Sequence, residues 1–136
     1  MTSSPIDAVR TFIAAINRRC LPEMTALMAH DHTFVDSVGR VTTGRENVAT
    51  GWAAYIEMFP DYEIHIDSIL ADGKQVAVFG SASGTYAGKR GLVPENRIVM
   101  PAAWRARVAG GKIQEWQVYA DWTEGSRVIG EDERSC

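Results

Sequence analysis

Cysteine and long apolar runs are both scarce in this sequence. Only Cys20 and Cys136 occur among its 136 residues, which supplies neither a disulfide framework nor the ligand spacing of a zinc site. No segment reaches the ~18 apolar residues that a membrane span needs, and the first residues lack the basic start and apolar stretch of a secretory signal. We therefore expect a cytoplasmic protein in a reducing compartment.

Concentrated positive charge is also absent. The 14 Lys and Arg are scattered along a chain of net charge −3, which argues against nucleic acid as a partner because phosphate binding needs a concentrated basic face. The sequence has no nucleotide-binding loop, serine-hydrolase elbow or zinc signature. These absences leave acid/base chemistry without a cofactor, or ligand binding alone.

The residues that are present are those of one globular domain. Hydrophobic residues make up 46% of the chain and charged residues 23%, close to average usage. A chain of this length removes roughly two thirds of its unfolded surface from water on folding. We expect one folded domain over residues 1–122 and a polar, mobile C-terminal extension over residues 123–136.

Three helices are predicted in the first half. Ser4 and Pro5 are typical of a helix start, and apolar residues at helical spacing continue that helix to about Arg19. Pro22 predicts the start of a short second helix. Thr43 and Glu46 have the spacing of a capping box, which predicts a third helix that ends near Phe59.

Alternating segments predict five strands. Asp72-Gly73 and Gly110-Gly111 are turn signals that join four of them into two hairpins. Hairpins imply antiparallel pairing, and a single apolar stripe on each helix implies helices on one sheet face. We predict an α+β fold in which a curled antiparallel sheet wraps around three helices as a cone, with strands over residues 32–38, 62–70, 74–86, 98–108 and 112–121.

Aromatic residues favour a partly hollow interior. Trp104 alternates with Arg105 and so should point inward. Small residues share its strand face, and large rings opposite small residues are typical of small-molecule pockets. The alternative is a plain aromatic core. The residues expected to line the pocket are Phe12, Phe34, Trp52, Tyr55, Phe59, Trp104, Trp116 and Val118.

Four stretches carry a family resemblance over roughly residues 6–122. They are Phe34-Val35-Asp36-Ser37-Val38-Gly39, Thr43-Gly44-Arg45-Glu46, Phe59-Pro60-Asp61-Tyr62 and Gly111-Lys112-Ile113 with Trp116-Gln117-Val118-Tyr119. In order and spacing they resemble the SnoaL-like members of the nuclear transport factor 2-like superfamily, which includes ketosteroid isomerases, limonene epoxide hydrolases and polyketide cyclases. The resemblance implies a cone-shaped α+β barrel, usually dimeric, whose mouth admits an apolar ligand, although such a fold does not fix the reaction.

Asp36 is the first catalytic candidate, because its segment resembles the one that carries the aspartate base of ketosteroid isomerases. A carboxylate between Phe34 and Val38 is expected to be poorly solvated, which suits a group that takes up a proton. The alternative is an Asp at a strand end that accepts hydrogen bonds from loop amides.

The rest of the isomerase and hydrolase machinery is missing from the resemblance. Phe12 stands where isomerases carry a catalytic tyrosine, and Trp104 replaces their protonated aspartate. Val118 occupies the place of one aspartate of the hydrolase triad. Asp121 lies one residue from the acid/base aspartate of SnoaL-like cyclases and is the second catalytic candidate, with capping of the turn at Trp122 as its alternative.

The histidines carry no prediction of chemistry. His65 alternates with apolar neighbours and is expected on a solvated or subunit-facing side. His30 and His32 could bind a metal only if a third ligand converged. We predict a polar turn there, no metal and no cofactor.

These observations favour a cofactor-independent enzyme for a hydrophobic polyketide, terpenoid or steroid-like molecule, acting by isomerisation, cyclisation or hydration. A non-catalytic binding protein for a small hydrophobic ligand is the alternative, and a dimerisation module is a third hypothesis. We also expect a homodimer through the outer sheet face, where Arg105, Arg107 and Gln117 offer a broad mixed surface.

Overall fold

The computed structural model describes residues 4–135, so Cys136 and residues 1–3 lie outside the described part of the chain. The described residues form four α-helices and six strands, with one 3-10 turn. The helices are α1 (Pro5–Asn17), α2 (Leu21–Leu27), α3 (Arg45–Met58) and α4 (Thr123–Glu133). The strands are β1 (Met28–Val35), β2 (Val41–Thr43), β3 (Glu63–Asp72), β4 (Gln75–Thr85), β5 (Arg97–Ala109) and β6 (Lys112–Ala120), and the turn is η1 (Pro94–Asn96).

The strands form one curled, unclosed sheet in the order β2-β1-β6-β5-β4-β3. Both predicted hairpins are confirmed, since β3 pairs antiparallel with β4 and β5 with β6. The prediction of an all-antiparallel sheet is wrong at one place, because β1 runs parallel to β6 and aligns Phe34 with Trp116. This parallel pair brings the end of β1 to the same edge as the end of β6.

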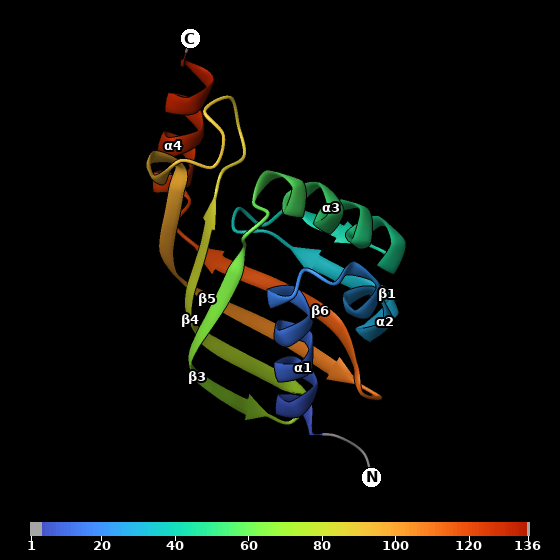
Figure 1. Ribbon diagram of the computed structural model, residues 1–136. Coiled ribbons are helices and arrows are strands. Elements are labelled where there is room, and N and C mark those ends of the chain that lie inside the picture. The colour runs from blue at the N-terminus through green and yellow to red at the C-terminus, as the bar shows by residue number, and fades with distance from the viewer. Residues whose placement is uncertain (1–3, 136) are drawn as a thin grey trace.

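Helix α1 packs across the inner face of the sheet, where it contacts β3, β4, β5 and β6 (Figure 1). It begins as the sequence predicts, with the Ser4 hydroxyl accepting a hydrogen bond from the Asp7 amide at 3.1 Å. Most of its apolar stripe is buried, including Phe12 and Ile16, while Ile6 at its start is partly buried. The helix therefore covers one part of the inner face and leaves space elsewhere on it.

The start of α3 differs from the predicted capping box. Gly44, with φ of 97°, is the N-cap, and no side chain caps the helix. Thr43 belongs instead to the short strand β2, which pairs with β1 opposite Thr33. Three residues therefore extend the sheet where the sequence predicted only a helix start.

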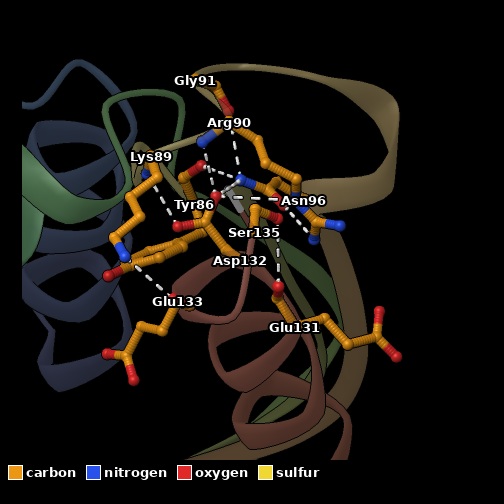
Figure 2. Close-up of polar contacts among 9 residues, drawn as sticks. All are labelled: Tyr86, Lys89, Arg90, Gly91, Asn96, Glu131, Asp132, Glu133 and Ser135. Carbon is orange, nitrogen blue, oxygen red and sulfur yellow. Dashed lines mark hydrogen bonds and ion pairs between the residues drawn. The ribbon is translucent and has the colours of Figure 1, made fainter.

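We expected residues 123–136 to be a mobile extension, but residues 123–133 form helix α4. Val128 packs fully buried, and Asp132 has only 1% of its surface exposed. The Asp132 carboxylate accepts hydrogen bonds from the Lys89 and Arg90 amides and from the Asn96 side chain at 2.7 to 3.0 Å, as Figure 2 shows. These hydrogen bonds hold α4 against the loop between β4 and β5.

The loop itself is shaped to receive Asp132. A Cβ atom at Gly88 would lie 2.1 Å from a carboxylate oxygen of Asp132, so only glycine allows this approach. Asn96, fully buried, also donates to the Tyr86 and Gly91 carbonyls. Loss of solvent around Asp132 favours its neutral form, but the hydrogen bonds outweigh that effect and lower its pKa.

The outer face of the sheet carries an apolar patch. Phe79, Ala103 and Tyr119 lie side by side on β4, β5 and β6. Phe79 and Tyr119 are each 47% exposed. Beside them Arg105 forms an ion pair with Glu115 at 2.7 Å.

Candidate binding cavity

A cavity of about 430 Å³ lies between the inner face of the sheet and helix α3. Its walls are mostly apolar. It is lined by Phe34, Asp36, Ser37, Thr42, Val48, Gly51, Trp52, Tyr55, Met58, Tyr62, Ala82, Met100, Ala102, Trp104, Trp116, Val118, Ala120, Trp122 and Ile129. The volume and lining are those of a small-molecule site.

The sheet side of the cavity alternates large and small residues. Trp104 and Trp116 come from neighbouring strands and stack with ring centroids 6.4 Å apart. Ala82 and Ala102 lie on the same inner face and are too small to reach across it. Two large flat rings beside two methyl groups leave the space that the sequence predicted.

The helix side of the cavity is a cluster of interlocking aromatic rings. Trp52 and Tyr55 come from α3 and meet edge to face at 6.1 Å. Tyr62, which directly precedes β3, contacts both of them. Phe34 of β1 also contacts Trp52. Such packing fixes each ring in place.

Asp36 lies on the cavity wall, immediately after β1. Its Oδ1 accepts hydrogen bonds from the Val38 amide at 3.0 Å and the Arg40 amide at 2.9 Å. The expectation that Asp36 has apolar surroundings is wrong in part, because the chain turns after Asp36 and leaves Val38 71% exposed. Asp36 is half-buried, so one oxygen is held by the loop while the carboxylate stays in contact with both cavity and solvent.

Asp121 does not line the cavity. Its carboxylate is exposed and accepts hydrogen bonds from the Thr123 amide and hydroxyl at 2.9 and 2.5 Å. These bonds, first from the hydroxyl and then from the amide, lower the pKa of Asp121. The geometry is that of a side chain that closes the turn at Trp122-Thr123 just before α4, and within residues 4–135 no side chain caps the helix itself.

Six of the eight predicted pocket residues line the cavity: Phe34, Trp52, Tyr55, Trp104, Trp116 and Val118. Phe12 and Phe59 do not line it. Phe12 is 0% exposed and packs edge-on against Trp116 at 5.1 Å, so it is core behind the cavity wall. Phe59 packs between Tyr86 and Trp122, next to a much smaller recess of about 10 Å³.

Several lining residues were not predicted from the sequence. Tyr62 alternates with inward-facing Ile64, a signal that could have placed it on the cavity side. Met100 likewise shares the face of Trp104. Trp122 and Ile129 gave no signal, because their positions depend on α4 and on the polar contacts that hold it.

His65 and His32 lie in opposite surroundings, one exposed and one buried. His65 is exposed and lies 3.3 Å from Asp67, on the solvated side that alternation predicts. His32, expected in a polar turn, is instead fully buried within β1. Its Nδ1 donates to the Ile113 carbonyl at 2.7 Å, and burial lowers the pKa of the ring. His32 is therefore a neutral core residue.

Nowhere in residues 4–135 do three His, Cys, Asp or Glu side chains come together in a way that could hold a metal ion. Within the same residues, no helix combines the length and hydropathy that a membrane crossing needs.

Comparison with known proteins identifies relatives by family and by fold. The family model of the SnoaL-like domain matches residues 9–116. No curated protein matches the chain. A hypothetical protein with a ketosteroid isomerase-like fold from Catenulispora acidiphila, solved with trimethylamine, is 23% identical with a TM-score of 0.77, over 98% of this chain and 95% of that one.

Two other solved structures have the same fold. A proposed SnoaL-like polyketide cyclase from Shewanella denitrificans is 12% identical with a TM-score of 0.81, over 93% of this chain and 97% of that one. TerC, co-crystallised with polyporic acid, is 18% identical with a TM-score of 0.78, over 93% of this chain and 99% of that one. At these identities the likeness concerns the fold.

Proposed function

This chain belongs to the family of SnoaL-like domains, and from that premise we propose that it binds a small, largely apolar organic molecule in its cavity and transforms it by acid/base catalysis. The observation that carries the proposal is a single carboxylate, Asp36, on the wall of an aromatic cavity of about 430 Å³. Two solved structures of the same fold contain small organic molecules, trimethylamine and polyporic acid, which supports the class of ligand.

Asp36 has the geometry of a general base. The loop amides hold Oδ1, and among residues 4–135 no hydrogen bond engages Oδ2. A proton from an acidic C–H bond of the ligand would move to Oδ2, leaving its electron pair as an enolate, and would later return to a carbon or oxygen of the product. This step supports isomerisation or cyclisation of a polyketide, terpenoid or steroid-like substrate. In a hydration the same base would instead take a proton from a water molecule whose oxygen bonds to a carbon of the substrate, and that proton would return to the product.

A second candidate function is binding without catalysis. It is favoured by the two amide hydrogen bonds of Asp36, which by themselves explain the residue as a loop-stabilising group. In that case the cavity binds its ligand without chemical change, and Asp36 only stabilises the loop that follows β1.

Proton exchange separates the two functions. 2-Tetralone carries acidic C–H bonds next to a ketone, and NMR in D2O follows their replacement by deuterium. If the protein is an enzyme, these hydrogens exchange faster in its presence than in buffer alone. Asp36→Asn should then lower the exchange rate by about 100-fold or more, because the amide cannot take up the proton. Asp121→Asn keeps the wild-type rate.

The controls are the fold and the binding of the same ligand. In Asp36→Asn the side-chain amide oxygen still accepts hydrogen bonds from the two loop amides, so the melting temperature should stay close to the wild-type value. Exchange at the buffer rate in a wild-type protein that binds 2-tetralone would exclude the enzyme and leave the binding function.

We also propose that two copies pair through their outer sheet faces. The patch of Phe79, Ala103 and Tyr119 offers apolar area, and the Arg105–Glu115 ion pair gives it a polar border. An apolar centre with a charged rim is the usual composition of a protein interface.

A further inference from the structure

Tyr55 and Tyr62 face the cavity as a pair. Tyr55 comes from α3 and Tyr62 from the residue before β3, and their ring centroids are 5.1 Å apart. Both line the cavity. Only 7% of the surface of Tyr62 is exposed, so its phenol is removed from bulk solvent.

Neither tyrosine hydroxyl has a hydrogen-bond partner among residues 4–135. Within that part of the chain, the enclosed side-chain polar atoms without a partner are His32 Nε2 and Trp52 Nε1. The two tyrosine hydroxyls are not among these enclosed atoms, and both side chains line the cavity. Two hydroxyls without a protein partner on a cavity wall are available to donate to a ligand that enters the cavity.

The backbone holds Tyr62 firmly. Arg19 Nη1 donates to the Tyr62 carbonyl at 3.0 Å, and the Tyr62 amide donates to the Phe59 carbonyl at 3.0 Å. Just beyond Tyr62, the Asn17 side chain bonds both the amide and the carbonyl of Ile64, at 2.8 and 2.9 Å. A donor on such a fixed support loses little freedom when it engages a ligand.

Both phenols are neutral donors over the whole physiological range. Burial raises the pKa of Tyr55 to about 12. Burial, with a smaller effect from Tyr55, raises the pKa of Tyr62 as well. Because the two rings lie 5.1 Å apart and both line the cavity, the two hydroxyls are near enough to act on the same ligand.

We propose that Tyr55 and Tyr62 form the hydrogen-bond donor pair of the cavity, and that they select ligands carrying a carbonyl or enolate oxygen over pure hydrocarbons. The inference rests on the proposed small-molecule function and adds a ligand class to it. Phe12 cannot supply this donor, since it has no hydroxyl and packs outside the cavity.

The test compares 2-tetralone with tetralin, which has the same bicyclic skeleton but lacks the ketone. Calorimetry measures the affinity of each for the wild type, Tyr55→Phe and Tyr62→Phe. Each substitution should weaken 2-tetralone by about three- to tenfold, the effect of one neutral hydrogen bond. Tetralin affinity should not fall, because phenylalanine keeps the ring. Tyr119→Phe makes the same chemical change outside the cavity and should alter neither affinity.

A pH series adds a second readout. The ratio of the two affinities in the wild type should stay constant from about pH 6 to about pH 9, since the donors do not ionise there. If tetralin and 2-tetralone weaken equally, or if neither substitution weakens the ketone, the donor pair is refuted while the binding function stands. If neither compound binds the wild type, the proposed function and the donor pair both fail.

Discussion

Replacing Phe12 by alanine tests the correction that moves this residue from the pocket to the core. Phe12 is 0% exposed and packs against Trp116 at 5.1 Å and His32 at 6.4 Å. Removing a fully buried phenyl ring loses both its transfer free energy and its contacts around the space left behind, about 3–5 kcal/mol in comparable cores. For 136 residues, that is a large part of a total stability of roughly 7–20 kcal/mol.

Urea denaturation measures this cost directly. We expect the midpoint to fall with no change in the slope, and the melting temperature to drop by about 10–17 °C. Phe12→Leu, which conserves more volume, should cost about 1.5 kcal/mol or less and leave tetralin affinity within about twofold. The reasoning is refuted if Phe12→Ala leaves the midpoint unchanged, or if Phe12→Leu weakens tetralin as strongly as a change in the cavity wall does.

Four further substitutions probe the fold and the proposed dimer. Gly80→Ala should destabilise the protein strongly, because its Cβ would lie 1.8 Å from the His65 carbonyl oxygen; Gly51→Ala, with open space around the Cβ, should raise the melting temperature. Hydrogen bonds lower the folded-state pKa of Asp132 below its ordinary value of 3.8, so its stabilising effect is present above pH 3.8 and lost as the pH falls through the folded-state pKa. Asp132→Asn should reduce the melting temperature at neutral pH and flatten the loss of stability between about pH 4 and about pH 2. Phe79→Glu should convert the proposed dimer to a monomer in light scattering, and a monomeric wild type at micromolar concentration would contradict the dimer.

Local signals in the sequence were enough to predict most of the fold. The Ser4 cap, the Asp72-Gly73 turn and the strict alternation around Trp104 are each decided by residues close in the chain, and each is confirmed. The parallel pairing of β1 with β6 joins residues such as Phe34 and Trp116. A pairing over that separation leaves no local pattern, so hairpin logic could not find it.

Helix α4 escaped prediction for a different reason. Its anchor is Asp132, a buried carboxylate whose partners lie in the loop before β5. Hydrophobic periodicity cannot reveal a helix that is fastened by a polar side chain. The cavity residues Trp122 and Ile129 were missed with it.

The part of the candidate site that was predicted is the part that the alternation of strand residues determines. Alternation placed Phe34 and Asp36 on the same face, and both line the cavity. Alternation alone missed the turn that exposes Val38. The two amide hydrogen bonds to Asp36 are local, and the alternative of a strand-end Asp bonded by loop amides describes them.

The central claim, that the cavity holds a small apolar molecule, is tested most directly by titrating tetralin into the wild type and into Ala102→Phe. Ala102 lines the cavity beside Trp104, so a phenyl ring there fills the binding space without adding charge. We predict one tetralin per wild-type chain, bound with a negative heat-capacity change. The variant should fold but bind at least about tenfold more weakly, a loss of about 1.4 kcal/mol. No binding to the wild type, or equal binding to both proteins, would contradict the account.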